Sequence, residues 1–277
     1  MEIIIYIAIA ITGVVFGSFF TLAVYRIPRK ENIVYVRSHC TTCGHKLNFW
    51  DLIPVFSYIF LGGKCRYCGE KIRARYLLLE IFSGLVFLTL ALTTGLQNII
   101  YLIFAYLFMA GMFIIAGIDK ENYKIPNGVI IYELCIAIIY FIFSVILYYK
   151  TNMQLADFAL TISSVVTHMS DKILGAVLIP LILLIINKLV EKLQKSKDDS
   201  PIGYGDIKYL SVIGLMFGFS VQILAIVLSS LIGLIGFIIH KYKEIPWGYY
   251  LSIATIVVLI ISPYIKELLD LIKVWGW

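Results

Sequence analysis

Charged residues are scarce in this sequence. Asp, Glu, Lys and Arg together make up 14% of the 277 residues, whereas hydrophobic residues make up 61%. A soluble globular domain has about 25% charged and about 45–50% apolar residues. The shortage of charge therefore excludes a soluble protein and predicts an integral membrane protein. The net charge of +6 comes mostly from loops between apolar runs, so we expect no nucleic-acid partner.

The apolar runs are long enough to cross a bilayer, which requires about 20 residues. Eight runs are expected to be transmembrane helices: 3–24, 77–95, 98–118, 128–149, 172–191, 207–219, 221–240 and 247–265. The sixth run is short and contains glycine, so the expected number is about eight. The first run lacks a preceding basic segment and a good cleavage site, so we expect it to remain as a span and not to be a signal peptide.

Basic residues are few in alternate loops. The loop at 95–98 has no charge, whereas residues 26–76 hold ten Lys and Arg against three acids. The positive-inside rule then places 26–76 in the cytoplasm. Threading eight spans puts 119–127, 192–206 and 241–246 on the same side, and basic residues occur in each of them. The sequence therefore predicts an all-α, polytopic membrane protein with a small cytoplasmic domain between its first and second helices.

Cysteine is also rare, but four of the five cysteines form two C-x-x-C pairs. Cys40 and Cys43 are separated from Cys65 and Cys68 by 21 residues, and a glycine follows each pair. Two such knuckles are typical of a four-cysteine zinc site. The alternatives are two disulfides, which a reducing cytoplasm disfavours, and a loop that folds without metal. The fifth cysteine, Cys135, is expected to be a core residue.

Two aspartates stand where apolar runs meet the cytoplasmic side. Asp119 closes the run 101–118, and Asp206 precedes the run that begins at Ile207. An ionisable group at such a position is costly and is interpreted as functional by default. Two carboxylates that lie close together cannot both ionise easily, so one becomes a base and the other an acid. We therefore expect the two to meet and to activate water against a peptide carbonyl, as in an aspartic protease.

The glycines before Asp206 fit this interpretation. Gly203 and Gly205 are predicted to let the backbone take positive φ and to let an extended substrate approach closely. The structural alternative is that each aspartate only ends a helix near lipid headgroups. Asp206 fits that role as an N-cap, but a carboxylate such as Asp119 is disfavoured at a helix C-terminus.

In their order along the chain, these motifs resemble the bacterial prepilin peptidase family. Its members are bifunctional type IV prepilin leader peptidases and N-methyltransferases of the GxGD aspartic protease class. The matching segments are Gly17-Ser18-Phe19 to Pro28, the cysteine knuckles around Trp50-Asp51-Leu52-Ile53-Pro54, Arg75-Tyr76 with Glu80, Ile118-Asp119 with Ile125-Pro126-Asn127, Gly203 to Lys208, and Ile245-Pro246-Trp247-Gly248. The departures are Thr21 in place of a usual asparagine, Thr41 in place of a frequent proline and Ile202 in place of a common methionine; none touches the aspartates.

The resemblance implies a function. It implies that Asp119 and Asp206 cleave the basic leader of type IV prepilins or pseudopilins at the cytoplasmic face of the bacterial inner membrane. The new N-terminus is then N-methylated with S-adenosylmethionine. Supporting residues in the aspartate motifs are Gly203, Gly205, Lys208 and Pro126. The chain lacks a Rossmann-type glycine-rich loop, so the methyl-donor site is left unplaced, with residues 26–76 and Glu80 as candidates. Glu80 also has a structural alternative, an ion pair with Arg73 or Arg75.

We expect four parts in the chain: 1–25, a first transmembrane helix; 26–76, a zinc-binding and methyltransferase domain; 77–265, a peptidase core; and 266–277, an interfacial segment. One alternative is a monofunctional GxGD peptidase whose zinc domain, held by Cys40, Cys43, Cys65 and Cys68, is only structural. A second is an ion-coupled transporter, which would predict inverted repeats that the sequence does not show. A third is a zinc-dependent membrane scaffold without catalysis.

Overall fold

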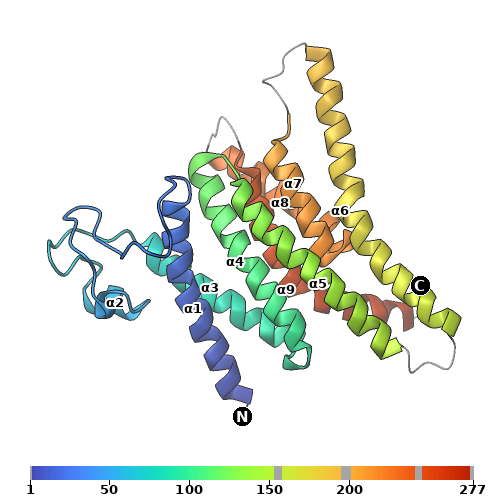
Figure 1. The fold of residues 1–277 in the computed structure, drawn as a ribbon, viewed down its shortest axis with the longest axis horizontal. Helices are drawn as coiled ribbons and strands as arrows, with labels where there is room; N and C mark the ends of the chain where they lie inside the picture. Colours follow the sequence, from blue (N-terminus) through green and yellow to red (C-terminus); the bar gives the residue numbers. More distant parts are fainter. Residues whose placement is uncertain (1, 153–157, 195–200, 241–244, 275–277) are drawn as a thin grey trace. The chain divides into compact units, whose positions relative to one another are not determined.

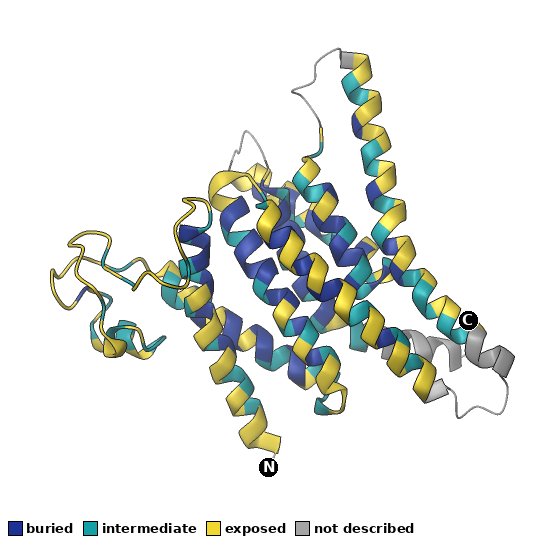
Figure 2. Ribbon diagram, in the orientation of Figure 1, coloured by how far each residue is buried: buried dark blue, intermediate teal, exposed yellow. Residues whose placement is uncertain are grey.

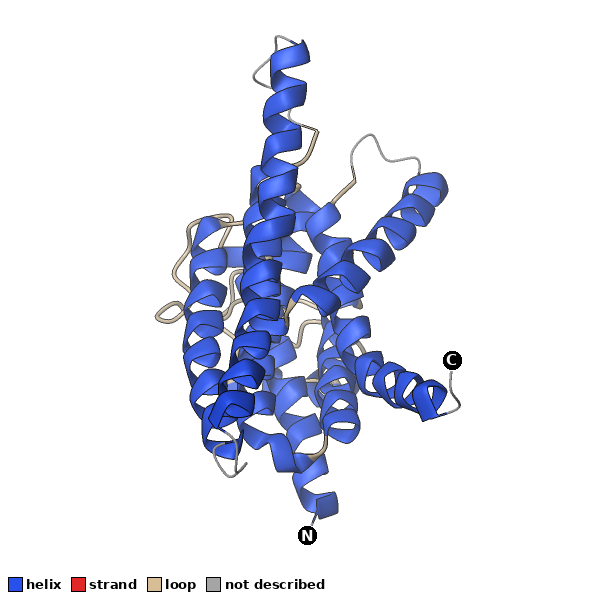
Figure 3. Cartoon of the chain, turned by 90° about the vertical axis from the view of Figure 1, so that its right-hand side faces the viewer, coloured by secondary structure: helices blue, strands red, loops and turns tan. Residues whose placement is uncertain are grey.

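The chain is helical throughout most of the part that the computed structural model describes, residues 2–152, 158–194, 201–240 and 245–274. Figures 1 and 3 show helices joined by loops, and no strand is drawn in the described residues. The helices are α1 Glu2–Arg26, η1 Phe49–Asp51, α2 Phe56–Phe60, α3 Arg75–Thr94, η2 Leu96–Asn98, α4 Ile99–Asn122, α5 Asn127–Asn152, α6 Phe158–Gln194, α7 Tyr204–Phe217, α8 Phe219–His240 and α9 Trp247–Val274. The predicted all-α architecture is confirmed.

Seven helices in the described residues are long and apolar enough to cross a membrane, so the chain is a multi-pass membrane protein. The expected sixth span is the exception, because α7 has only 14 residues. The fifth and last spans are longer than predicted: α6 has 37 residues, and α9 continues to Val274. Most of the segment expected at 266–277 therefore continues α9, which ends at Val274. Residues 275–277 lie outside the described part.

The chain divides into two compact units, Met1–Leu102 and Ile103–Trp277, which are described here separately. In the first unit, α1 packs along α3. Gly13 of α1 lies so close to α3 that an added Cβ would come within 2.9 Å of the Cα of Gly84. The hydroxyl of Ser83 donates to the Gly13 carbonyl at 2.8 Å. Small residues thus let these two helices approach closely, as helices in membranes commonly do.

A segment without long helices joins α1 to α3 in the first unit. We call residues 27–74 the loop domain; it contains η1 and α2. The guanidinium of Arg26, at the end of α1, is buried and donates to the carbonyls of Asn32 and Val36 at 3.0 and 2.8 Å. Arg26 thereby anchors the first turn of the loop domain to the end of the helix.

In the second unit, α7 is the central helix. It contacts α5, α6, α8 and α9, and residues of α7 and α9 are among the most buried (Figure 2). Gly214 of α7 faces Gly175 of α6 so closely that a Cβ on either residue would meet the backbone of the other helix. Phe108 of α4 contacts Phe217 of α7 edge to face, with 5.1 Å between ring centroids. The short α7 is therefore a buried helix among its neighbours.

Candidate active site and metal centre

The two cysteine knuckles of the loop domain have the same local structure. In the first, the Gly44 N–H donates to the Cys40 carbonyl at 2.9 Å; in the second, the Gly69 N–H donates to the Cys65 carbonyl at 3.0 Å. Both glycines have positive φ, 70° and 72°, which a residue with a side chain rarely adopts. A single β-bridge closes each knuckle. The sequence C-x-x-C-G thus produces two copies of one turn.

The knuckles bring four sulfur atoms together. The Sγ atoms of Cys40, Cys43, Cys65 and Cys68 all lie within 4.8 Å of one another, and those of Cys40 and Cys68 are 3.9 Å apart. A tetrahedral zinc ion with Zn–S bonds of about 2.3 Å requires sulfur separations of about 3.8 Å. The four thiols are free, so the disulfide alternative does not describe this structure. The cluster therefore fits a metal ion, as predicted.

The thiol pKa values show how the cluster would respond to a cation. The Cys43 backbone N–H is the strongest of several influences that lower the pKa of Cys40 to about 6. At Cys68, the backbone N–H of Glu70 lowers the thiol pKa. Burial and the three neighbouring thiols raise it by more, so the pKa of Cys68 is about 12. The Cys40 thiol therefore ionises readily, whereas ionisation of Cys68 is unfavourable. A bound cation makes that ionisation favourable, because metal ligation deprotonates thiols.

Next to the knuckles, Asp51 organises a polar cluster. Its carboxylate accepts hydrogen bonds from Arg66 Nε at 2.6 Å, the Tyr67 hydroxyl at 3.1 Å and the Asn48 backbone N–H at 3.1 Å. Burial raises the pKa of Asp51, but these hydrogen bonds outweigh it, so the net pKa is below its ordinary value. Because Arg66 and Tyr67 lie between Cys65 and Cys68, the cluster ties η1 to the second knuckle.

Glu80 of α3 is buried and has a different partner from those expected. Its Oε2 atom accepts the backbone N–H of Val55 at 2.8 Å, and the Ser18 hydroxyl also interacts with it. Glu80 therefore connects the loop domain to α1 and α3.

In the second unit, Asp119 lies in the last turn of α4 with 5% of its surface exposed. Its Oδ2 atom accepts the backbone N–H of Tyr249 at 3.0 Å, near the start of α9. A Cβ on Gly248 would lie 3.1 Å from the same oxygen. The first turn of α9 thus packs directly on this carboxylate, and only glycine fits without displacing it.

Asp206 lies in the first turn of α7, which begins at Tyr204 and not at Ile207. Its carboxylate is within electrostatic range of Asp119, and the Gly248 backbone N–H interacts with both carboxylates. The Oδ1 atom of Asp206 is buried and has no hydrogen-bond partner among the described residues. The carboxylates of Asp119 and Asp206 are therefore near enough to interact electrostatically, and Gly248 lies beside Asp119.

The prediction that the glycines before Asp206 take positive φ was wrong. Neither Gly203 nor Gly205 has positive φ. A Cβ on Gly203 would lie 2.7 Å from Asp206 Oδ2, and one on Gly205 would lie 3.3 Å from the Cβ of Ile125. Space around the carboxylate, and not backbone conformation, requires small residues here.

The other supporting residues hold the loop between α4 and α5. Pro126 directly precedes α5, and its carbonyl accepts the Val129 N–H at 3.1 Å. Lys208 Nζ donates to Asn127 Oδ1 at 3.2 Å, so it binds the start of α5 and does not face Asp206. These contacts position Ile125, whose side chain lies close to both Gly205 and Gly248.

Sequence reasoning missed a buried layer next to the aspartates. Glu133 of α5 is fully buried, and neither carboxylate oxygen has a hydrogen-bond partner in the described structure. Tyr209 of α7 lies within electrostatic range of Glu133 and of both aspartates, and its hydroxyl pairs with Ser252 of α9 at 2.8 Å. Ser252 in turn donates to the Gly248 carbonyl at 2.8 Å. A lone glutamate inside the run 128–149 was the available signal.

Cys135 was also misplaced. It is exposed on α5 and is not a core residue.

A pair of aspartates at the ends of helices in a multi-pass membrane protein is the arrangement expected of a membrane aspartic protease. Comparison with known proteins identifies the family. Residues 11–94 match the model described as the bacterial peptidase A24 N-terminal domain, and residues 106–238 match the type IV leader peptidase family. The chain belongs to the type IV leader peptidase family.

Curated relatives cover most of the chain. A prepilin leader peptidase/N-methyltransferase of Vibrio cholerae is 30% identical over 85% of this chain and 86% of its own length. Proteins with the same name from Pseudomonas putida and Bacillus subtilis are 26% and 28% identical, over 88% and 80% of this chain and 86% and 78% of their own lengths. No solved structure matches the chain.

Proposed function

We propose that this protein is a bifunctional prepilin peptidase and N-methyltransferase. In this proposal, Asp119 and Asp206 cleave the basic leader from type IV prepilin-like precursors, and the new N-terminal amine is then methylated by S-adenosylmethionine. The observation that carries the proposal is that the two aspartates, from α4 and α7, meet at the Gly248 N–H. Family membership and the names of the relatives support both activities.

The carboxylate pair can split a peptide bond by acid–base chemistry alone. One aspartate takes a proton from water as the water oxygen attacks the scissile carbonyl carbon, and the other gives a proton to the carbonyl oxygen. The carbon–nitrogen bond then breaks and the leaving amine takes up a proton. The dyad titrates as a unit, so neither role is assigned to one residue. The Tyr249 N–H orients Asp119. The buried Oδ1 of Asp206, which has no hydrogen-bond partner in the described structure, would accept a hydrogen bond from that water once substrate binding opens the site.

Methylation uses the amine that cleavage releases. The neutral amine attacks the methyl carbon, a carbon–nitrogen bond forms as the carbon–sulfur bond breaks, and S-adenosylhomocysteine leaves while the product loses a proton. S-adenosylmethionine supplies the electrophilic methyl group. Cys40, Cys43, Cys65 and Cys68 would hold a zinc ion in a structural role, since four thiolates would fill a tetrahedral shell and leave no open position.

Both aspartates belong at the cytoplasmic face of the inner membrane. Asp119 ends one helix and Asp206 begins another, so they lie at the same end of the helices, and basic residues follow α4 and precede α7. A precursor's hydrophobic helix stays in lipid while its basic leader remains in the cytoplasm. The junction between them then lies at the level of the aspartates.

The test is to incubate the purified protein with a prepilin peptide and methyl-labelled S-adenosylmethionine and to measure product masses. Wild type should release the leader and label the new N-terminus. Asp206→Asn and Asp119→Asn should each reduce cleavage by about 10²–10⁴-fold, since acid–base groups contribute that much. Asp171→Asn is the matched control, because Asp171 lies beside Gly218 at the other end of α7.

Each alternative outcome has a meaning. Cleavage without any labelled product would support a monofunctional peptidase with a structural zinc domain. Cleavage that survives both asparagine variants would refute the dyad. Absence of cleavage together with proton or cation flux in vesicles would favour a transporter.

A further inference from the structure

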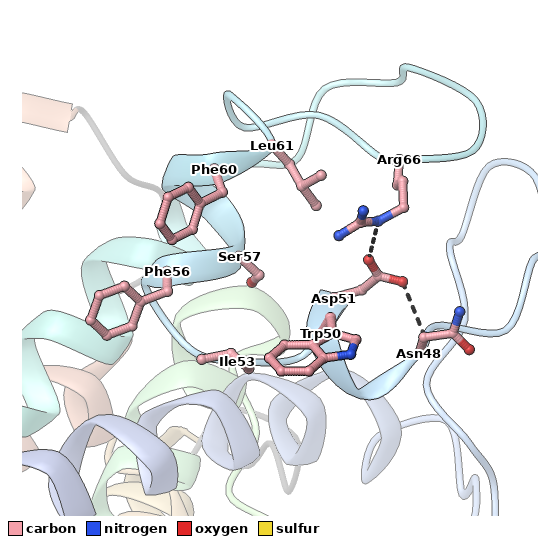
Figure 4. Close-up of a pocket in the computed structure, with 9 residues that line it drawn as sticks. All are labelled: Asn48, Trp50, Asp51, Ile53, Phe56, Ser57, Phe60, Leu61 and Arg66. Atoms are coloured by element: carbon pink, nitrogen blue, oxygen red, sulfur yellow. Dashed lines mark hydrogen bonds and ion pairs between the residues drawn. The ribbon is translucent and has the colours of Figure 1, made fainter.

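A pocket opens in the loop domain, and no residue of the aspartate motifs lines it. Its volume is about 570 Å³, which lies within the usual range of about 300–1,000 Å³ for small-ligand sites. Figure 4 shows its walls, which are Asn48, Trp50, Asp51, Ile53, Phe56, Ser57, Phe60, Leu61 and Arg66. The peptidase chemistry described above uses none of these residues.

One end of the pocket is polar and carries both signs of charge. The Asp51 side chain is only 3% exposed, and it fixes Arg66 through the 2.6 Å contact with Nε. Figure 4 shows the other guanidinium nitrogens of Arg66 turned away from Asp51. Fixed guanidinium N–H groups suit a carboxylate, and the Arg66 side chain is 50% exposed. This end therefore matches the carboxylate of an amino acid.

The other end of the pocket is flat and aromatic. The rings of Phe56 and Phe60 project from α2, and the indole of Trp50 lies on the opposite side of Ile53 from Phe56 (Figure 4). These rings are 60%, 83% and 70% exposed. Aromatic faces stack with bases and attract cations. This end therefore matches a purine attached to a sulfonium centre.

The backbone that shapes the pocket is strained. Val55 has φ 64° and ψ −54°, and the Phe56 N–H donates to the Pro54 carbonyl at 2.7 Å. This is the rare form of the γ-turn, which is strained for a β-branched residue. It places Ile53 and Phe56, two pocket residues, on either side of Val55. Strain of this kind persists only where surrounding contacts hold it, and here Glu80 does so by accepting the Val55 N–H.

We propose that this pocket is the S-adenosylmethionine site of the N-methyltransferase activity. The adenosyl group lies among Trp50, Phe56 and Phe60, and the carboxylate of the amino-acid end lies at Arg66, which Asp51 holds in place. Glu80 does not line the pocket; it is a positioning residue that acts through Val55. The inference rests on the proposed function, because the ligand is the methyl donor of that reaction.

The test measures equilibrium binding of S-adenosylhomocysteine to the full-length, zinc-loaded protein by calorimetry, with leader cleavage measured in parallel. Ser57→Trp fills the pocket and should weaken binding at least tenfold. Ile59→Trp is the matched control, since Ile59 is on the same helix, is 61% exposed and does not line the pocket. It should change binding less than twofold. Both variants should cleave the leader at the wild-type rate.

Two further pairs cover misfolding and the role of Glu80. Phe60→Ala removes an exposed ring and should weaken binding about tenfold, whereas Ile59→Ala should not. Glu80→Leu removes the acceptor for Val55 and should weaken binding, whereas Glu80→Gln keeps an acceptor oxygen and should restore it. Wild-type cleavage and retained zinc in each variant would show that the fold survives.

The outcomes separate the two proposals. If wild type neither binds S-adenosylhomocysteine nor labels a pre-cleaved pilin peptide, the methyltransferase function fails and the pocket assignment with it. If wild type does both but Ser57→Trp and Phe60→Ala bind S-adenosylhomocysteine normally, only the assignment is wrong. If these variants lost affinity only for the pilin peptide, the pocket would be the binding site of the methyl acceptor, and its assignment to S-adenosylmethionine would be wrong.

Discussion

The metal centre and the aspartate pair are built in opposite ways. Every ligand of the cysteine cluster lies between Cys40 and Cys68, and two copies of a five-residue motif make the turns that aim the sulfurs. The aspartate site draws Asp119 from α4, Asp206 from α7 and Gly248 from the first turn of α9. The first site depends on local turns, and the second depends on how helices pack.

The two sites also differ in what stabilises them. The loop domain has few buried apolar side chains; Cys65 is the one hydrophobic residue from 27–74 that is buried in the described structure. A small domain with so little core needs a metal or disulfides. Around the aspartates, by contrast, Ile207, Tyr209, Leu210 and Leu251 are almost completely buried. A metal ion should therefore control one site and side-chain packing the other.

Metal removal should separate the two sites most strongly. Structural zinc contributes about 10–16 kcal/mol of apparent binding free energy to small zinc domains. Chelation, or Cys68→Ser, should therefore unfold the loop domain, expose residues 27–74 to proteolysis and abolish methylation. Leader cleavage should fall much less, because its residues lie in the second unit. Elemental analysis should find one zinc per chain in wild type.

Cys135→Ser is the control for that experiment. It removes an exposed thiol from α5 and should leave the zinc content and both activities unchanged. If chelation abolished cleavage and methylation equally, the two sites would not be independent, and the comparison between them would fail.

Gly248→Ala should act on the aspartate site alone. The added Cβ would come within 2.8 Å of Ile125 Cδ1 and 3.1 Å of Asp119 Oδ2, so the carboxylate must shift by a few tenths of an ångström. A misplacement of about 1 Å costs up to about 10²-fold in rate, so a decrease of about tenfold in kcat is expected. Methylation of a pre-cleaved peptide should be unaffected.

Gly128→Ala is the matched control for that substitution, because a Cβ at Gly128 would have no neighbour within 4 Å. Alanine is also the better helix former. A Gly248→Ala enzyme with wild-type kcat would show that the first turn of α9 does not position Asp119.

A third prediction tests helix packing without touching either site. Gly214→Ala forces a Cβ into the backbone of α6 at Gly175, and neither backbone can move cheaply. We expect a loss of about 1–3 kcal/mol, the usual cost of overpacking. It should appear as a lower Tm of the detergent-solubilised protein, while the loop domain keeps its zinc. An unchanged Tm would mean that α6 and α7 are more loosely packed than the structure has them.

The difference between the sites explains what the sequence could predict. Spacing alone identified the cysteine cluster, since the knuckle is a local turn with a fixed pattern. The aspartate pair was found because costly carboxylates at the ends of apolar runs are few. Gly248 was part of a recognised motif, but its place between the carboxylates depends on the packing of α9 against α4 and α7. The conformation of Gly203 was mispredicted because a glycine can be required by the lack of room for a Cβ as well as by a positive φ.

Glu133 shows the limit of motif reasoning and provides the smallest predicted effect. No motif includes it, yet it is fully buried in α5 with both oxygens unpartnered in the described structure, and Gly111 of α4 makes room for it. Glu133→Gln removes the ionisable group with little change of shape. A buried polar group without a partner costs about 1–3 kcal/mol, and the amide shares that cost without the expense of burying a charge. We therefore expect a Tm equal to wild type or slightly higher, with both activities kept. If cleavage were lost while the Tm stayed the same, Glu133 would be acting on the aspartates through Tyr209 and Ser252, and the aspartate site would extend one layer deeper than the pair itself.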